Sequence, residues 1–457
     1  AVAYLDTEGE PQDWLYDSIT VLGHANTSDG GLFIISGSDT NYADKADWED
    51  WLNHIYYYQT PDGQVTNMDA LEQAVAEVKE SMVARGLISQ AEADAYTVPV
   101  KIAVYPAIHS FAGWGTADET VHVTKAADGT LSITGVTQET VHCDFTLEGN
   151  GGNVDQTLTA RASAYYWYMK KAAEMFAEKG YKNITLGGFY FYNEILYPVE
   201  DSLAEDSVIL YNMLVDYIAQ EKGYEKLYSY WIPYYTATGY KDWEKYGFDY
   251  AIMQPHAYGY GQTRLETAAD FSYFYGLGVE MEWMGMNTPG YTDTFIQYLT
   301  TGASKGYQEG VQAWYWGTWD LARLCEGQGS YAGYRYIYDL TYQYISGSPV
   351  YGDNLLQTSQ VSLKFRSAAD TSALDSQLYL LSDGVYGDQA QWGTNVLQLN
   401  NNSFPSPTEI TAKLAEPSAI TSLQMYFYDW QSAGVYEPYA VQYYVSADGQ
   451  EWQLIGT

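Results

Sequence analysis

Short apolar runs alternate with helical stretches from about residue 17 to residue 346, and this alternation limits the fold more than any other feature of the chain. The runs are almost continuous in apolar and aromatic residues, which is typical of strands buried on both faces. Seven of them have the length of a strand: residues 17–23, 98–106, 184–194, 227–235, 249–258, 279–284 and 311–317. Residues 31–37 are a further candidate, either as an eighth strand or as an edge hairpin.

Apolar residues at helical spacing predict helices between these strands. The predicted helices cover residues 68–85, 162–178, 208–221, 264–275 and 291–304. Seven or eight strand–helix units in succession favour an α/β fold of the (β/α)8 TIM-barrel type, with an open doubly wound sheet as the alternative. No Gly-x-Gly-x-x-Gly motif follows the first strand, which argues against a dinucleotide site. Alternation around Ala127-Asp128-Gly129 predicts a hairpin inserted at about residues 115–150, either as a wall of a substrate cleft or as a decoration of the rim.

The pattern changes after Ser348-Pro349, where runs of strand length and turns replace the helical spacing. We therefore expect a barrel over residues 1–348 and an all-β domain over residues 349–457. The second domain resembles the discoidin-type, galactose-binding-like β-sandwich, and the likeness is carried by Asp383-Gly384, Trp392, Ser446, Asp448-Gly449 and Trp452. Because Thr457 comes earlier than such a sandwich normally ends, we expect a truncated module. Asp383 and Asp388 are candidate ligands of a structural calcium ion, although turn chemistry explains them equally well.

The charge balance excludes several classes of partner. The chain has 58 acidic and 21 basic residues, a formal net charge of -37. Such a surface repels nucleic-acid backbones and anionic membranes, so we expect neither nucleic-acid binding nor membrane insertion. Polyanionic substrates are disfavoured as well, because no cluster of Lys and Arg is visible in the sequence. No apolar run approaches the roughly 18–20 residues that cross a bilayer.

Aromatic residues are unusually frequent, with 48 Tyr and 14 Trp. Their flat apolar faces and polar tips suit the rings and hydroxyls of sugars, which favours a carbohydrate substrate, although many must simply fill strands and core. We expect a secreted protein, outside the cell or on the cell surface of a bacterium. The sequence leaves the oligomeric state open. It also leaves open whether Cys143 and Cys325 form one disulfide or remain two unrelated thiols.

The strongest chemical signal is Tyr190-Phe191-Tyr192-Asn193-Glu194, in which a hydrophobic strand runs directly into a carboxylate. In a TIM barrel the carboxyl ends of the strands form the catalytic face. A carboxyl placed there against aromatic rings loses hydration, so its pKa rises and it can serve as a general acid near neutral pH. The alternative is that Glu194 only caps the following loop.

A second signal is the strand Val279-Glu280-Met281-Glu282-Trp283. Its two glutamates point to the same face, and buried charges are costly unless they are functional or paired. Glu282 is nearer the carboxyl end and is our first choice as the nucleophile, while the reverse order with Glu280 stays open. Glu280 would lie one layer deeper, bonded to Arg161 or to tyrosines. The alternative is a buried ion-pair network.

These carboxylates fit the chemistry of glycoside hydrolysis, in which one carboxylic acid protonates the leaving oxygen and one carboxylate attacks the anomeric carbon or activates water. Glu194 ends the third clear strand and Glu282 the sixth, which places them across the mouth of a barrel. The arrangement resembles the large clan of retaining TIM-barrel glycosidases. That resemblance implies that Asn193 binds the sugar 2-hydroxyl, that His256 or Tyr258 orients the nucleophile, and that Trp314 or Trp316 floors a subsite.

A closer likeness covers nearly the whole barrel. It is carried by residues 2–19, by Gly187–Glu194 (GGFYFYNE), by residues 230–258 with Trp-Ile-Pro-Tyr-Tyr and Gln-Pro-His, and by residues 276–283 (GLGVEMEW). These segments resemble the bacterial family of domain of unknown function 4855. The family's opening Asp reads as Glu8 here. Its frequent company with sugar-binding modules implies carbohydrate work, and the likeness supports the fold more than any substrate.

Weaker candidates for substrate contact are Asp17, His24, Asp29 and His109, each better explained as a loop or capping residue. The aromatic candidates are Trp114, Tyr192, Trp231, Tyr234 and Tyr235, for which packing is the alternative. The prediction is thus a secreted, retaining glycoside hydrolase that requires no cofactor. The alternative is a non-catalytic carbohydrate-binding protein with a degenerate barrel. A metal-dependent hydrolase or deacetylase is disfavoured, because the chain has only six His and no His-x-His or His-Glu-x-x-His motif, so we expect no metal site.

Overall fold

The computed structural model describes residues 2–22, 45–57, 67–104, 114–143, 154–196, 203–285, 288, 290–317, 320–331 and 333–347, and beyond these 362–366, 381, 409–414, 420, 423, 425, 427, 438 and 440–456. The chain divides into two compact units. The first comprises Ala1–Met284 with Thr301–Ser348, and the second comprises Gly285–Thr300 with Pro349–Thr457. Over the described residues, no helix combines the length and hydropathy needed to cross a bilayer.

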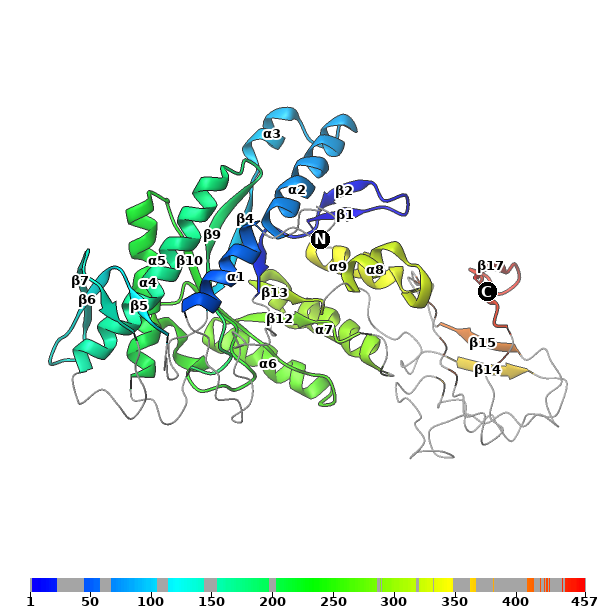
Figure 1. The fold of residues 1–457 in the computed structure, drawn as a ribbon. Coiled ribbons are helices and arrows are strands. Elements are labelled where there is room, and N and C mark those ends of the chain that lie inside the picture. The colour runs from blue at the N-terminus through cyan, green and yellow to red at the C-terminus, as the bar shows by residue number, and fades with distance from the viewer. Residues whose placement is uncertain are drawn as a thin grey trace. The chain divides into compact units, whose positions relative to one another are not determined.

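The first unit is built on a sheet of seven parallel strands (Figure 1). In chain order these are β3 (Ile19–Val21), β4 (Val98–Val104), β9 (Ile184–Phe191), β10 (Tyr228–Trp231), β11 (Tyr250–Met253), β12 (Gly278–Glu282) and β13 (Gln312–Tyr315). Each strand pairs in parallel with the next one along the chain, so the strand order never reverses. A doubly wound sheet requires such a reversal. The order is instead that of successive strand–helix units in a barrel, as predicted.

The sheet is curled. Thr20 on β3 and Tyr230 on β10 are hydrogen-bonded through their hydroxyl groups. These strands are three positions apart, which is about 14 Å in a flat sheet and beyond the reach of the two side chains. The strands must therefore bend round a common interior, and the described part of the sheet forms a half-barrel. Residues 31–37, the candidate eighth strand, lie outside the described residues.

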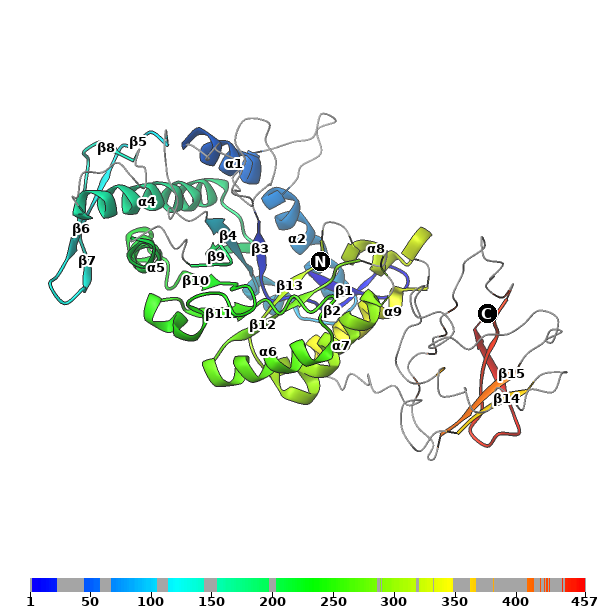
Figure 2. The ribbon, with the colours of Figure 1, turned by 90° about the horizontal axis from the view of Figure 1, so that it is seen from below.

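All five predicted helices are present: α2 (Asn67–Ala84), α4 (Val154–Lys179), α5 (Ala204–Lys222), α6 (Gln262–Tyr275) and α7 (Tyr291–Lys305). Figure 2 shows α2, α4, α5 and α6 around the outside of the strands. The sequence analysis did not predict the helices α1 (Lys45–Tyr57), α3 (Gln90–Ala95), α8 (Asp320–Glu326) and α9 (Arg335–Ile345), or the short 3-10 helices η1 (Tyr240–Tyr246), η2 (Tyr307–Glu309) and η3 (Gly329–Tyr331).

Alternation along the strands separates two cores. On β9, Phe189 and Phe191 face the outer helices and belong to the large cluster that those helices complete. Tyr190, between them, points to the interior and packs with Tyr230 and Ile252. Because the interior of the half-barrel is lined by tyrosines, it carries polar groups deep into the fold, close to where the strands end.

The predicted hairpin insertion is present as β6 (Thr120–Lys125) and β7 (Leu131–Thr137), flanked by the short strands β5 (Thr116–Ala117) and β8 (Val141–His142). The Val121 N–H donates to Ser163 Oγ on α4 at 2.9 Å. Lys125 forms an ion pair with Asp206 at the start of α5. The hairpin therefore packs on the outer helices, which favours a decoration over a cleft wall.

A second hairpin, β1 (Ala3–Leu5) with β2 (Pro11–Trp14), comes before the sheet begins. Arg85, directly after α2, donates to the backbone oxygen of Pro11 and lies 3.7 Å from the Asp6 carboxylate. The hairpin thereby contacts the first long helix of the barrel.

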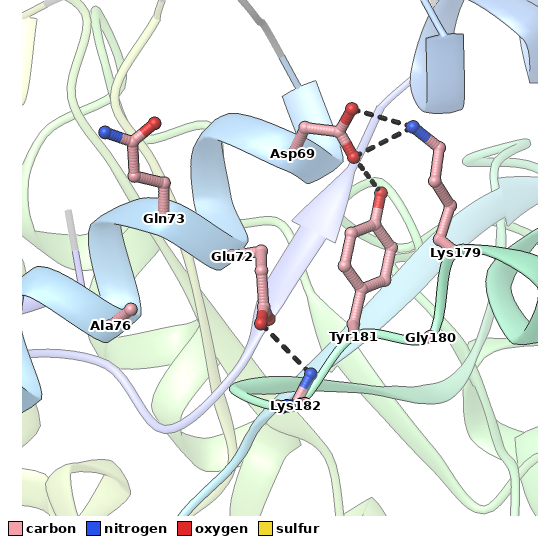
Figure 3. Close-up of a pocket in the computed structure, with 8 residues that line it drawn as sticks. All are labelled: Asp69, Glu72, Gln73, Ala76, Lys179, Gly180, Tyr181 and Lys182. Carbon is pink, nitrogen blue, oxygen red and sulfur yellow. Dashed lines mark hydrogen bonds and ion pairs between the residues drawn. The ribbon is translucent and has the colours of Figure 1, made fainter.

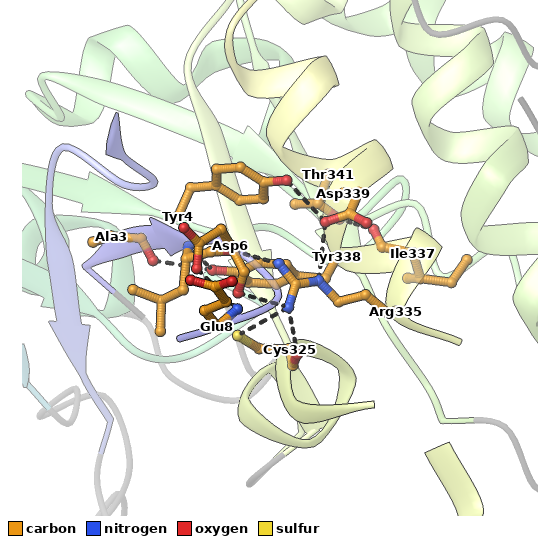
Figure 4. A network of polar contacts seen from close by, with 11 residues as sticks. Ala3, Tyr4, Asp6, Glu8, Cys325, Arg335, Ile337, Tyr338, Asp339 and Thr341 are labelled. Atoms are coloured by element: carbon orange, nitrogen blue, oxygen red, sulfur yellow. Dashed lines mark hydrogen bonds and ion pairs between the residues drawn. The ribbon is translucent and has the colours of Figure 1, made fainter. Parts of the chain in front are cut away.

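The same hairpin is bound to the last helix through Arg335 of α9 (Figure 4). The Arg335 guanidinium donates to the backbone oxygens of Leu5, Asp6 and Cys325, and to the Asp339 carboxylate. Its Nε lies 3.0 Å from Asp339 Oδ1, which also accepts from the Tyr4 hydroxyl at 2.9 Å. The β1–β2 hairpin therefore connects the two ends of the strand–helix series.

In the second unit, two antiparallel strand pairs are described: β14 (Ser362–Arg366) with β15 (Glu409–Lys413), and β16 (Tyr443–Val445) with β17 (Gln453–Gly456). The turn between β16 and β17 is closed by the Gly449 N–H, which donates to Ser446 Oγ at 2.8 Å. These pairs do not by themselves establish the predicted sandwich. The candidate calcium ligands Asp383 and Asp388 lie outside the described residues.

The two cysteines remain separate thiols. Cys143, after β8, is buried, and burial raises the pKa of its thiol to about 12. Cys325 is on α8, beside Arg335. Of the two alternatives that the sequence left open, the structure has the two thiols.

Candidate functional site

The carboxyl ends of β9, β11 and β12 bring together the residues that the sequence analysis singled out. Glu194 follows β9 by three residues, His256 follows β11 by three, and Glu280 and Glu282 lie on β12 itself. β9 and β12 are the third and sixth strands of the sheet, as expected. Because parallel strands end at one edge, these side chains share the face on which barrel enzymes carry their sites.

Glu280 and Glu282 are both buried, at 7% and 2% exposure. They are two residues apart on β12 and therefore point to the same side, which is the interior of the curl. Burying two carboxyl groups on one strand costs free energy unless each has a hydrogen-bond or charge partner, or is protonated. The two carboxyl groups differ in this respect.

Glu282 is oriented by His256. The backbone N–H of His256 donates to Glu282 Oε2 at 2.7 Å, and the ring Nδ1 lies 3.8 Å from Oε1. This contact with Glu282 raises the pKa of the His256 imidazole. The Tyr258 hydroxyl donates to the backbone oxygen of Glu282. The residues predicted to orient the nucleophile thus do contact Glu282, His256 mainly through its backbone.

Glu194 lies where the sequence analysis places the general acid. Burial raises the pKa of its carboxyl above the ordinary value, and the negative charge of Glu282 raises it further. The positive charge of His256 and a hydrogen bond from the Gln254 side chain act in the opposite direction. The side chain is nevertheless exposed to solvent. Glu194 is therefore a carboxyl biased toward its protonated form and open to a ligand.

Glu280 is protonated more readily still. Burial raises the pKa of its carboxyl well above the ordinary value, and the charges of Glu282 and Glu194 add to this. Its Oε2 is buried and has no hydrogen-bond partner among the described residues. The expected bond to Arg161 is wrong, because Arg161 extends from α4 and donates to Ser207 on α5 at 2.9 Å.

Gln254 is a site residue that the sequence analysis missed. It directly follows β11, and its side chain donates to the carboxyls of both Glu194 and Glu280, lowering both pKa values. Its backbone N–H donates to the Pro233 oxygen at 2.8 Å, which fixes its position after the strand. The sequence does contain a pattern that could have identified Gln254, because a polar side chain follows an apolar strand here as it does at Glu194.

Lys101 was missed as well. It lies on β4 and points into the curl, where its Nζ donates to Ser18 Oγ at 2.9 Å and lies 5.6 and 5.5 Å from the ring centres of Tyr230 and Tyr250. Burial lowers the pKa of Lys101, and the charge of Asp17 opposes this. Lys101 therefore supports the interior below the carboxyl cluster.

Asp17 is not brought to the site, contrary to expectation. It precedes β3 by two residues, at the amino end of the strand, whereas the cluster lies at the carboxyl ends. His24, Asp29 and His109 lie outside the described residues.

Trp314 and Trp316, expected to floor a subsite, lie on the other face of the sheet from Glu280 and Glu282. In the register of β12 and β13, Trp314 pairs with Met281, whereas Tyr315 pairs with Glu282. The rings of Trp314 and Trp316 are stacked with centres 6.2 Å apart, and Trp316 lies 6.0 Å from Trp283. The indole N–H of Trp316 donates to the Tyr16 hydroxyl at 2.6 Å, and that of Trp283 to Asp320 on α8 at 2.8 Å. These bonds fix the rings that follow β12 and β13.

Two other predicted sugar-stacking residues are packing residues. Trp231 is fully buried and donates its indole N–H to the backbone oxygen of Asn193 at 2.7 Å, so it supports the segment that carries Glu194. Trp114 is 1% exposed and lies edge-on to Trp48 and Trp167, among the outer helices. Neither ring has a free face for a sugar.

Tyr192 and Tyr235 remain partly exposed. Tyr192 lies beside the carboxyl cluster. Burial is the main cause of the raised pKa of the Tyr192 hydroxyl, and the charges of Glu194 and Glu280 raise it further. Tyr235 packs against Arg264 in the first turn of α6.

A surface pocket of about 350 Å³ lies elsewhere, between α2 and the turn before β9 (Figure 3). Asp69 binds Lys179 at 2.7 Å and accepts from the Tyr181 hydroxyl at 2.6 Å, while Glu72 accepts from the Lys182 N–H at 3.0 Å. These groups satisfy one another and tie α2 to the amino end of β9. The pocket is therefore at the opposite end of β9 from Glu194. No group of three or more His, Cys, Asp or Glu able to hold a metal occurs within the described ranges.

Two solved structures resemble the fold remotely. A β-mannanase of glycoside hydrolase family 113 from Alicyclobacillus acidocaldarius, in complex with ManMIm, is 14% identical and covers 63% of this chain and 80% of its own, with a TM-score of 0.30. The family 53 glycoside hydrolase catalytic domain from Ignisphaera aggregans is 11% identical, covers 60% and 79%, and has a TM-score of 0.28. Similarity this remote says nothing of the reaction. No protein with a curated description matches the sequence. Residues 1–343 match the family described as Domain of unknown function (DUF4855), and the chain therefore belongs to that family.

Proposed function

We propose that this protein is a retaining glycoside hydrolase in which Glu194 is the general acid and base and Glu282 is the nucleophile. One observation carries the proposal: two strand-end carboxyls of one site have opposite environments. Glu194 is biased toward protonation, whereas Glu282 accepts a hydrogen bond from the His256 backbone and faces its imidazole. Titratable pairs whose surroundings differ in this way are the mark of an acid and its partner.

The reaction then takes two steps. Glu194 gives its proton to the glycosidic oxygen while Glu282 attacks the anomeric carbon, so the leaving alcohol departs and a glycosyl ester forms on Glu282. Glu194, now ionised, takes a proton from water, whose oxygen attacks the same carbon and releases Glu282. Glu194 regains its proton and the anomeric configuration is retained.

Glu282 is preferred over Glu280 as the nucleophile. The raised pKa of Glu280 favours its neutral form, which is a poor nucleophile. Glu280 also lies two residues before Glu282 on β12, further from the carboxyl end of the strand. Glu280 is better suited to share the hydrogen-bond network of Gln254. In this proposal Asn193, Tyr192 and Tyr315, which pairs with Glu282 across β12 and β13, border the reacting carbon and bind the sugar.

The raised pKa of Glu194 also favours a hydrolase over a binding protein that lacks activity. A binder gains nothing from a cleft carboxyl whose pKa is raised, because sugar hydroxyls bond equally well to carboxylates. Hydrolysis, by contrast, needs that proton at neutral pH.

The test uses aryl glycosides and a panel of plant and host glycans, with product anomers followed by NMR. Glu194→Gln should lower kcat roughly 10²- to 10⁴-fold on natural glycans, and far less on aryl glycosides whose leaving group needs no proton. Glu282→Gly should be inactive and regain turnover with azide, giving the β- or α-glycosyl azide that follows from one displacement. Glu309→Gln, an exposed glutamate after α7, is the matched control.

Full turnover of natural glycans by Glu194→Gln would contradict the assignment of Glu194 as the general acid. Inverted product anomers would exclude a covalent intermediate on Glu282. Tight glycan binding by the wild type without any hydrolysis would instead favour the carbohydrate-binding alternative.

A further inference from the structure

Arg264, in the first turn of α6, is held between two aromatic rings beside the site. Its guanidinium carbon lies 4.0 Å from the ring centre of Tyr235 and 4.0 Å from that of Tyr260. The two rings cover the two flat faces of the guanidinium, an arrangement that uses cation–π attraction and leaves only the edge of the group for hydrogen bonds.

That edge is only partly used. Nε donates to the backbone oxygen of Pro255 at 2.6 Å, and Nη2 lies 3.3 Å from the Tyr234 hydroxyl. Both partners are neutral. No carboxylate in the described part of the chain lies within ion-pair distance of Arg264, although 58 acidic residues are present for 21 basic ones. Arginine presents five N–H donors, so N–H groups remain on an edge that carries a full positive charge.

The group also adjoins the reacting residues. The His256 ring lies 5.7 Å from the Tyr234 ring and 6.2 Å from the Tyr260 ring, so the aromatic clamp of Arg264 is continuous with the residue that holds Glu282. The positive charge of Arg264 acts on His256 and lowers its pKa against the larger effect of Glu282. Tyr260 is 57% exposed, which leaves the clamp open to solvent on that side.

We propose that Arg264, clamped by Tyr235 and Tyr260, is a subsite for an anionic substituent, a carboxylate or a sulfate, on the glycan that this site cleaves. The proposal rests on the function proposed above and narrows its substrate class. A planar guanidinium fork matches both groups in a bidentate manner, and the clamp holds the fork in place before the ligand arrives.

The net charge of -37 limits how many negative groups a substrate of this site can carry. One local cation stabilises one negative group, while a chain of many negative groups is repelled by the surrounding acidic surface. The subsite therefore selects glycans with an isolated uronosyl or sulfated residue over polyuronides and heavily sulfated chains.

The experiment measures dissociation constants of the full chain by NMR titration. The probes are three methyl glycosides that share one ring and differ only at carbon 6: the hydroxymethyl compound, the uronate and the 6-sulfate, each in the gluco and galacto series. The wild type should bind at least one anionic probe about tenfold or more tightly than its neutral match, as expected for charge-assisted bonds. The stronger of the two anionic arms identifies the substituent.

Arg264→Gln should bring the anionic and neutral probes to within about twofold of each other, and Arg264→Lys should keep part of the preference because it keeps the charge without the fork. Lys241→Gln is the matched control. Lys241 also stacks on two tyrosines, with its Nζ 5.5 Å from the ring centres of Tyr240 and Tyr275, but it lies on η1, before the amino end of β11. It should keep the full preference.

Equal binding of neutral and anionic probes by the wild type in both series overturns the proposal. A preference that survives Arg264→Gln, in a variant whose circular dichroism matches the wild type, overturns it too. Hydrolysis is scored separately. A protein that prefers anions through Arg264 and cleaves no glycan contradicts the proposed function alone, whereas a hydrolase without that preference contradicts only the subsite.

Discussion

The backbone N–H of His256 and the ring of the same residue face the two oxygens of Glu282, with the N–H 2.7 Å from Oε2 and Nδ1 3.8 Å from Oε1. His256 has φ of 46°, a left-handed conformation uncommon outside glycine. This strained conformation in the turn after β11 directs both the backbone N–H and the ring of His256 toward the Glu282 carboxylate. Glu282 is therefore held in a single orientation.

Glu282→Gln should lower the pKa of His256 toward the ordinary value of about 6.5. The contact with Glu282 is the main cause of the raised pKa. Its loss leaves burial and the charge of Arg264, which both lower the pKa, against the smaller opposite effect of the Glu194 charge. Imidazole signals followed by NMR across pH 5–9 measure the change. Glu280→Gln is the control, because Glu280 is not among the causes. A raised folded-state pKa means that the His256 interaction stabilises the fold fully below about pH 6.5 and is lost as pH rises through the raised value. An unchanged titration in Glu282→Gln would contradict the assigned contact.

Gln254→Leu should move the basic limb of the pH profile of kcat/KM to higher pH. The Gln254 amide lowers the pKa of Glu194, so its removal raises that pKa, and the acid stays protonated to higher pH. Maximal kcat should fall at the same time, because the bond also positions the carboxyl. Gln262→Leu, which removes a glutamine bonded to Thr301 on the outer helices, should leave the profile in place. A basic limb that does not move would show that Gln254 has a packing role only.

Glu280→Gln should stabilise the protein at neutral pH. The pKa of Glu280 is raised in the folded state, so its contribution is favourable below the unfolded value of about 4.3 and is lost as pH rises through the folded value. Glutamine fills the same space without a charge to bury. Thermal melting at pH 7 should therefore show a higher Tm than the wild type, and the gain should shrink by pH 4. Exposed Glu309→Gln should show no such difference between the two pH values, and a Glu280→Gln variant that is destabilised at pH 7 would mean that the carboxylate is paired after all.

Arg335→Met should lower the free energy of unfolding by roughly 2–4 kcal/mol, because one charged group supplies bonds to three backbone oxygens and to Asp339. Urea unfolding followed by tryptophan fluorescence measures it. Arg323→Met is the control: that side chain is 53% exposed and lies 3.7 Å from Asp320, so its loss should cost less than about 1 kcal/mol. Equal effects of the two substitutions would mean that the hairpin contributes little to stability.

The strands of the barrel were predictable because burial on both faces leaves a strong local pattern. Residues 184–194 became β9 (Ile184–Phe191), which is shorter at its carboxyl end. The overrun has a physical reason: the site residues after a strand stay aromatic or apolar although the ladder has ended. Helix α8 escaped prediction because it has only seven residues, too few for a helical period to be recognised. In α9 the apolar positions are largely tyrosines, which favour strands.

The site was predictable where a carboxylate interrupts an apolar strand, as at Glu194, Glu280 and Glu282. It was not predictable where the contact depends on tertiary packing. Nothing local shows that Trp231 turns outward or that Arg161 bonds to Ser207. Gln254 also follows an apolar strand, as Glu194 does, but glutamine is uncharged, so its burial is a weaker indication of function than the burial of a carboxylate.

The hydrogen bond between Arg335 and the backbone oxygen of Leu5 joins residues that are 330 positions apart in the sequence. During synthesis, residues 3–14 leave the ribosome long before α9 does, on the order of tens of seconds at ordinary elongation rates. Until then the β1–β2 hairpin lacks the helix whose Arg335 binds its backbone. Completion of this barrel is therefore a late event in synthesis, and residues 3–14 are among the last of the barrel to be secured.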